Sequence, residues 1–420
     1  MKTNALFIFV LLLLIQISAT GQENEKWKNN LYGFIRADAF YDTRQSIEAV
    51  DGMFLLYPAN TFYDSAGKDI NDISKLTMTS VSSRLGLNIT GKEFLNTKAQ
   101  LNAKIEADFT ARSNSNSLRL RHAYINVIFE KHSILMGRTW HPMFTPTNFP
   151  LTLSINVGTP FNPFNRSPQL RYTFTPNNNF TFIGAALYQN DYKNLGPSSD
   201  GTVDKQLDLM RNSKMPNLHI QGIWKTDITS IGLFGDYKKL QPRTYTTGTL
   251  GIFKTETTIE SYSAGIFMRI TKNKLKIKAK SLYGQNLTDH LLTGGYAVKS
   301  KNIQTGHETY TASNHLFNWI NLEYGKVLMA GVLVGYSKNL GFTNNPLKSE
   351  SIYARGADID YLYRVSPYIK WSKSRIELWA ETEFTTAAYG EIDYTNKGKV
   401  NNSKELTNIR VQFSCVYLIF

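Results

Sequence analysis

Polar and hydrophobic residues alternate along most of this chain. From Leu101 to Phe109 every second residue is apolar, and the residues between them are polar or charged. Residues 274–280 repeat the pattern with lysine at every second position. A two-residue period is that of a β-strand whose two faces meet different surroundings, and the 3.6-residue period of helices is nearly absent. The pattern therefore predicts an all-β chain.

Sixteen segments carry the strand pattern. The predicted strands are residues 31–41, 80–90, 98–109, 117–129, 132–140, 168–176, 179–189, 217–226, 228–238, 257–269, 274–285, 314–325, 327–337, 360–371, 374–384 and 406–420. Connections after the even-numbered strands of this series are short, and those after odd-numbered strands are mostly long and polar. Tight turns at one rim and long loops at the other are typical of a membrane barrel, and a soluble β-sandwich gives no reason for them. We therefore predict a transmembrane antiparallel up-and-down β-barrel of about 16 strands over residues 31–420.

Composition indicates which face of the strands points outward. Hydrophobic residues make up 42% of the chain and the mean hydropathy is −0.30, so no single segment has the composition of a membrane-spanning helix. In a membrane barrel the apolar face meets lipid and the polar face lines a wet interior. Sixteen closed strands leave an aqueous channel, and closure satisfies the backbone without water. Aromatic residues, 13% of the chain, suit the girdles at the two membrane surfaces.

The first residues have the layout of a secretory signal peptide. One lysine precedes an apolar run over residues 5–17, and Ala19, Thr20 and Gly21 provide the small residues of a cleavage site before Gln22. The run is shorter than the roughly 20 residues of a membrane-spanning helix. We predict a signal peptide over residues 1–21, a short N-terminal segment over 22–30, and export. A single cysteine, Cys415, leaves no intramolecular disulfide.

Charge then points to the kind of partner. The net charge is +14, and because the chain is exported, small anions or anionic lipid are better candidates than nucleic acid. Alternation puts a set of arginines on the polar side of the first six strands and of the last strands, which meet the first in a closed barrel. The set is Arg36, Arg84, Arg119, Arg121, Arg138, Arg171, Arg364 and Arg410, and Lys276, Lys278 and Lys280 form a second basic face.

An acid-free stretch accompanies these arginines. Residues 131–190 contain no Asp or Glu, and the predicted third external loop, residues 141–167, lies within them. That loop is rich in Pro, Phe and Asn, which suits a compact loop wedged in a barrel. We predict a basic wall beside an acid-free constriction. The alternative is that the arginines pair with neighbouring carboxylates or bind lipopolysaccharide phosphates. The carboxylates that point inward by alternation are Asp38, Glu106, Asp108, Glu377, Glu381 and Glu383.

Three segments resemble the DcaP-like outer-membrane porins. LYGFIRADAFYD, residues 31–42, is similar to the opening strand of that family. LRLRHAYINV, residues 118–127, followed by LMGRTWHPMF, residues 135–144, is similar to its Arg-His-Ala-Tyr strand and the Gly-x-Thr-Trp turn into a long loop. The resemblance implies a trimeric 16-stranded channel whose third loop folds into the pore. Some members have an N-terminal helical segment, which residues 22–30 are too few to supply, so a trimer would form through the barrel walls. The terminal Phe420 resembles the assembly signal of outer-membrane barrels.

These observations predict an outer-membrane porin for passive diffusion of small hydrophilic solutes, with a preference for anions such as carboxylates. The expected partners are small anionic solutes, outer-membrane lipid and lipopolysaccharide, and two further copies of the chain, with no nucleic acid. We expect no enzyme activity, cofactor or metal, because no nucleophile elbow or P-loop is present and the seven histidines lack metal-ligand spacing. The alternatives are a surface anchor or adhesin that uses the first loop, residues 42–79, and a lipid-modifying enzyme.

Overall fold

The computed structural model describes residues 27–50, 52–91, 98–111, 117–198, 202–348 and 350–419. The predicted signal peptide, residues 1–21, and the terminal Phe420 lie outside these ranges, so both remain predictions. None of the helices in the described ranges is long and apolar enough to cross a membrane.

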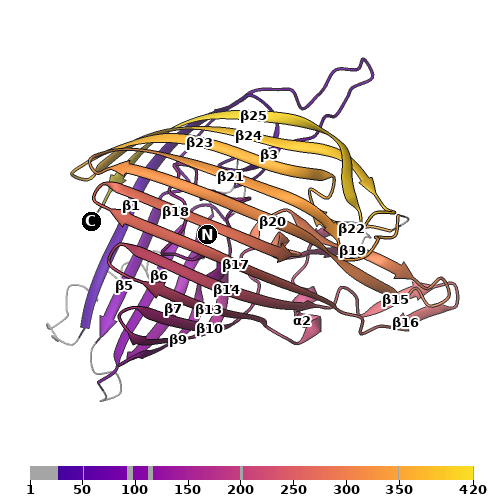
Figure 1. Ribbon diagram of the computed structural model, residues 1–420, viewed down its shortest axis with the longest axis horizontal. Helices are drawn as coiled ribbons and strands as arrows, with labels where there is room; N and C mark the ends of the chain where they lie inside the picture. The colour runs from indigo at the N-terminus through magenta and orange to yellow at the C-terminus, as the bar shows by residue number, and fades with distance from the viewer. Residues whose placement is uncertain are drawn as a thin grey trace, which may run out of the picture.

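Sixteen antiparallel strands close into one barrel, as predicted (Figure 1). The wall strands are β1 (Trp27–Asp42), β5 (Arg84–Gly91), β6 (Gln100–Asp108), β7 (Arg119–Phe129), β8 (His132–Trp140), β9 (Arg166–Asn177), β10 (Phe180–Leu187), β13 (Asn217–Lys225), β14 (Thr229–Leu240), β17 (Ile259–Lys272), β18 (Leu275–Gln285), β20 (Glu308–Gly325), β21 (Leu328–Phe342), β23 (Ile359–Lys373), β24 (Ile376–Asp393) and β25 (Lys399–Leu418). The ring closes where β1 pairs with β25, from Phe34 opposite Leu418 to Asp42 opposite Arg410. Every wall strand overlaps one of the sixteen predicted segments.

Shorter elements belong to the connections. They are β2 (Ser46–Ala49), β3 (Phe54–Pro58), β4 (Lys75–Thr79), η2 (Pro142–Phe144), β11 (Leu195–Pro197), β12 (Val203–Lys205), α2 (Asp208–Ser213), β15 (Tyr245–Gly248), β16 (Gly251–Lys254), η3 (Thr288–His290), β19 (Gly294–Lys301) and β22 (Ile352–Arg355). In Figure 1 the elements α2, β15, β16, β19 and β22 lie toward one end of the barrel, and the short hairpin turns lie toward the other. The short and the long connections therefore lie at opposite rims of the barrel.

The short turns have the backbone geometry that tight hairpins require. Glu130, Asn273 and Ser374 have φ angles of 52°, 56° and 55° in the turns between β7 and β8, β17 and β18, and β23 and β24. Two-residue hairpin turns need such left-handed residues because their twist matches that of the strands they join. The turn between β5 and β6 lies mostly outside the described residues.

The faces of the barrel are the reverse of those in a soluble protein. Ile105, Met136 and Ile220 are 53%, 66% and 70% exposed on the outer surface. Arg364 and Arg410 are fully buried on the inner side, although they are among the largest charged side chains of the chain. An apolar outer belt and charged interior fit a wall surrounded by lipid. The predicted orientation of the two faces is therefore confirmed.

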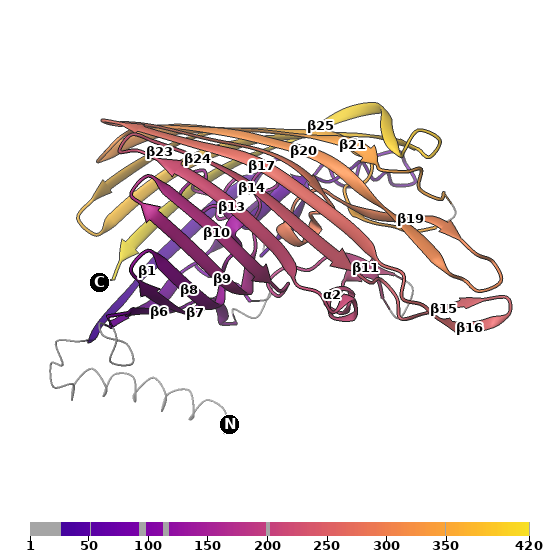
Figure 2. The same ribbon diagram turned by 60° about the horizontal axis from the view of Figure 1, so that its bottom comes forward.

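Several strands on one side extend beyond their predicted ends. β24 and β25 contain 18 and 20 residues, whereas β5 and β6 contain 8 and 9, and the long strands reach farther toward the loop rim in Figure 2. We predicted β25 to start at residue 406, but it begins at Lys399. Residues 399–405 are mostly polar, so they carry no alternation of apolar and polar positions and gave no strand signal.

Candidate functional site

Three arginines of the first strands gather around two carboxylates on the inner wall. Arg121 contacts both Glu106 and Asp108, with N to O distances of 2.7 Å each. Arg119 lies 3.2 Å from Asp108, and Arg84 lies 3.6 Å from Glu106. The side chains of both carboxylates are almost completely buried, and buried carboxylates are stable as ions only when cations surround them. The carboxylates therefore fix the positions of the guanidinium groups.

A β-bulge brings an extra side chain to this wall. His122 lies opposite Glu106 and Leu120 lies opposite Ala107, so Arg121 has no partner of its own in the register of β6 and β7. A bulge of this kind lets two consecutive side chains point to the same face. Both Arg121 and His122 are buried as a result. Of these two residues, the alternation alone predicted only Arg121 on the inner face.

Asp191 forms a second centre on the same wall. Its carboxylate lies 2.7 Å from Arg166, 2.9 Å from Arg138 and 3.9 Å from Arg119. Neither Asp191 nor Arg166 was among the site residues predicted from the sequence. The available signal was that Asp191 is the first acid after the acid-free stretch, which makes it the nearest carboxylate in sequence to Arg166.

Cations outnumber carboxylates in this network. Lys104 also lies 3.4 Å from Glu106. Six cations therefore share three carboxylates within 4 Å, namely Arg84, Lys104, Arg119, Arg121, Arg138 and Arg166 around Glu106, Asp108 and Asp191. We call these nine residues the basic wall. The arginines do pair with carboxylates, as the alternative prediction from the sequence stated. The network nevertheless keeps an excess of positive charge.

The third loop, residues 141–165, is held by strands far from β8 around the ring. Glu381 on β24 accepts a hydrogen bond from Ser154 N at 2.8 Å, and Glu383 accepts one from Asn156 Nδ2 at 3.1 Å. On β18, Lys280 donates to the carbonyl of Met143 at 2.7 Å. The loop contains no acid of its own, so strand residues supply the ionic groups that hold it.

The loop begins at His141, which is almost completely buried. Burial lowers the pKa of His141 well below its ordinary value, so the imidazole is neutral. Its Nδ1 accepts a hydrogen bond from Met143 N at 3.2 Å and caps η2. A neutral histidine can accept in this way because one ring nitrogen carries no proton.

Arg364 joins the first loop to the third. It lies 3.2 Å from Glu383 and donates to the carbonyls of Thr159 at 3.0 Å and of Leu55 and Leu56 at 3.1 Å. Phe54 and Leu56 of the first loop pack in one buried apolar cluster with Phe144, Phe161 and Phe164 of the third. Part of the barrel therefore contains a packed apolar core, which agrees with the predicted compact third loop but was not predicted to include the first loop.

A cavity of about 210 Å³ lies between the third loop and the basic wall. Its charged lining residues are Arg36, Arg84, Arg119, Arg121, Arg166 and Asp108, and its aromatic ones are Phe34, Phe54, Trp140, Phe149 and Phe164. Arg36 is paired with Asp38 at 2.6 Å and also donates to the carbonyl of Leu153 in the loop. Five guanidinium groups and one carboxylate therefore border this space.

The other predicted site residues have different surroundings. Arg171 donates to the carbonyl of Trp140 at 2.6 Å, next to the third loop. Lys276 and Lys278 lie 3.9 Å and 2.5 Å from Glu323. Lys280 is buried against the third loop, and Arg410 is fully buried against Asp42 at 2.7 Å.

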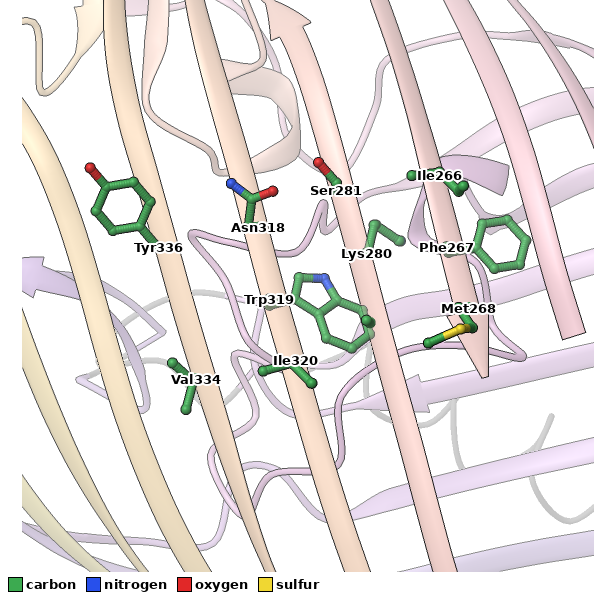
Figure 3. Close-up of a pocket in the computed structure, with 11 residues that line it drawn as sticks. Ile266, Phe267, Met268, Lys280, Ser281, Asn318, Trp319, Ile320, Val334 and Tyr336 are labelled. Atoms are coloured by element: carbon green, nitrogen blue, oxygen red, sulfur yellow. The ribbon is translucent and has the colours of Figure 1, made fainter. Parts of the chain in front are cut away.

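A larger, mostly apolar hollow lies over β17, β18, β20 and β21 (Figure 3). It measures about 410 Å³ and includes Ile266, Ile320 and Tyr336, all of which are exposed on the outer surface. Its lining is mostly apolar and contains none of the residues of the basic wall, so we do not assign the solute site to it.

The fold resembles solved outer-membrane proteins. No protein-family model and no curated protein matches the chain. The structure of the outer membrane channel DcaP of Acinetobacter baumannii matches with a TM-score of 0.65 at 16% identity, over 95% of this chain and 99% of that one. OmpT of Vibrio cholerae in a trimer form gives 0.55 at 10%, over 94% and 99%. The anion-selective porin from Comamonas acidovorans gives 0.53 at 10%, over 94% and 100%. At these identities the likeness establishes the architecture, and the chain therefore has the fold of the outer-membrane porins.

Proposed function

We propose that this protein is an outer-membrane channel for passive diffusion of small hydrophilic solutes, with a preference for anions such as carboxylates. The observation that carries the proposal is the basic wall, in which six cations share three carboxylates and four of the cations border a cavity. The resemblance to an outer membrane channel and to an anion-selective porin supports the same function. The third loop narrows the lumen to the space along this wall.

The arginines divide into two groups in this proposal. Those that border the cavity attract a passing anion, because a low-dielectric wall focuses their field into the lumen. They are Arg36, Arg84, Arg119, Arg121 and Arg166, with Arg138 and Arg171 beside them. Arg364, Arg410 and Lys280 are buried among protein groups, and they hold loops and strands in place. Lys276 and Lys278 form a separate basic site with Glu323.

We propose that the channel lies in the outer membrane. A closed wall with an apolar outer belt suits the outer membrane, which the protein reaches by means of its signal peptide, and lipopolysaccharide surrounds the outer half of the wall. OmpT of Vibrio cholerae has been solved as a trimer, and we propose that three copies of this chain associate through their outer walls.

A planar bilayer under a salt gradient tests the ion preference. The excess of cations in the basic wall should give a reversal potential of the sign that indicates anion selectivity. Liposomes that contain the protein should also swell in small sugars and organic acids. Cation selectivity would mean that carboxylates elsewhere dominate the lumen. Absence of both conductance and swelling would instead favour a surface anchor or an enzyme.

A further inference from the structure

Three metal-binding side chains meet where the third loop leaves the wall. His141 is the first residue of the loop, and His219 on β13 lies directly opposite Asp236 on β14 in the strand register. The side chains of all three are at most 5% exposed. They are far apart in sequence, so spacing along the chain could not reveal them.

The distances between these groups fit one metal ion. His219 Nδ1 lies 3.2 Å from Asp236 Oδ2, and His141 Nε2 lies 3.5 Å from the same oxygen. All three donor atoms lie within 4.8 Å of one another. Two ligands that each bind tetrahedral Zn²⁺ at about 2.0 to 2.1 Å stand about 3.3 to 3.4 Å apart. Small side-chain rotations would bring all three atoms to bonding distance.

Unpartnered polar atoms point to a missing ligand here. His141 Nε2 is buried without a hydrogen-bond partner among the described residues, and so is Nδ1 of His290, whose ring centre lies 4.6 Å from that of His141. Most buried polar atoms are paired, and a bound ion or water is one explanation for an exception. Lys238 pairs with Asp289 at 2.6 Å, so its ammonium group pairs with a different carboxylate from Asp236.

We propose that His141, His219 and Asp236 bind one divalent transition-metal cation of the Zn²⁺ class, with His290 as the nearest further imidazole. Imidazole ligands favour Zn²⁺ and its first-row neighbours, whereas Ca²⁺ and Mg²⁺ prefer an all-oxygen set. The site is independent of solute passage. It ties the start of the third loop to the wall at β13 and β14.

The hydrogen bond of His219 is compatible with a bound metal ion. The hydrogen bond of His141 would have to break when the metal binds. His219 Nε2 lies 3.2 Å from Gln221 Oε1, so with the metal on Nδ1 the ring donates its N–H to an amide oxygen, as metal-bound histidines usually do. Metal on Nε2 of His141 puts that ring's proton on Nδ1. The hydrogen bond from Met143 N is then lost, so metal binding should shift the turn over Pro142–Phe144.

Titration with Co²⁺ tests the site, because bound Co²⁺ has visible absorption that reports its geometry. The purified full-length protein, carrying no histidine tag, should bind one Co²⁺ in a tetrahedral environment, and Zn²⁺ should displace it. His219→Gln and Asp236→Asn should each weaken binding at least tenfold. His307→Gln, an exposed histidine in the connection between β19 and β20, is the matched control and should bind like wild type.

Wild-type protein that gives no tetrahedral Co²⁺ spectrum overturns the proposal by itself, whatever the variants do. Equal binding by wild type and His219→Gln overturns it as well, because adventitious surface binding would then explain the signal. After either result, the contact between His219 and Asp236 would be an ordinary hydrogen bond without a metal ion. Compact migration in unheated detergent gels first shows that each variant is folded. His141→Gln, whose position is in the loop and not in a wall strand, provides a further variant of the site.

Discussion

The arginines of the basic wall are both paired and in excess. Arg119 and Arg121 share Asp108, and Arg119 also approaches Asp191. Pairing holds the guanidinium groups in fixed positions, which a lone arginine on a flexible stem would not keep. Because the cations outnumber the carboxylates, we propose that the fixed groups still present a positive field to the lumen.

Replacing both Arg119 and Arg121 with Ser should lower anion selectivity several-fold. The change removes two of the six cations of the basic wall and leaves its three carboxylates, so most of the excess positive charge disappears. The reversal potential of the double variant under a salt gradient measures the effect. Lys276→Ser, at the separate site with Glu323, is the control and should shift the potential less.

The stability of the same double variant distinguishes the inner wall from the lipid face. An arginine facing lipid at the midplane costs about 2 to 4 kcal/mol, so its removal there would stabilise the barrel. Here both arginines are paired with buried carboxylates, so their removal should lower the temperature at which the barrel unfolds in detergent. An unchanged reversal potential together with higher stability would contradict our reading of these two residues.

At the scale of elements, the first and third loops are held by a few buried ionic groups. Arg364 bonds to backbone carbonyls of the first and the third loop and pairs with Glu383. Loops carry many backbone groups that cannot all pair with one another, so a buried loop needs side chains that accept and donate in their place. Arg364 and Glu381 have that role on β23 and β24, and Glu383 accepts a hydrogen bond from the side chain of Asn156.

Arg364→Met should loosen both loops. The change leaves Glu383 buried without its cation, and breaking a buried pair in this way costs about 3 to 5 kcal/mol. We expect larger and noisier single-channel conductance, measured in planar bilayers, because the closed wall remains while the loops lose their attachment. The double variant Arg364→Met/Glu383→Gln removes both charges and should recover part of the wild-type behaviour. Conductance identical to wild type in the single variant would show that the apolar cluster alone holds the loops.

At the scale of the whole molecule, closure determines the response to heat. β1 and β25 pair along nine residues, which joins the first and the last wall strand into one ring. Strands in lipid or detergent can satisfy their backbone groups only within such a ring. The protein should therefore migrate as a compact band in detergent gels when unheated and as an extended chain after boiling. Identical migration before and after boiling, with helical circular dichroism, would contradict the fold.

The sequence alone determined the number of strands, their order and which rim carries the loops. A two-residue alternation is a local property, and the parity of short and long connections follows from the chain order, so neither needs tertiary information. The exposed position of Ile105 and the buried position of Glu106 follow from the same alternation. The strand ends near the loops were less accurate, because the polar residues that begin β25 carry no alternation.

Only the tertiary structure decided how the charges meet. The bulge at Arg121 depends on the pairing of two strands, and in the sequence it appears only as two consecutive polar residues, Arg121 and His122. Asp191 joins Arg166, Arg138 and Arg119 because the chain returns to the same wall after the third loop. Contacts of this kind join residues far apart in sequence, and the closed ring brings them together. The sequence therefore predicted which residues face inward, and the fold determined which of them pair, which remain in excess and which hold the loops.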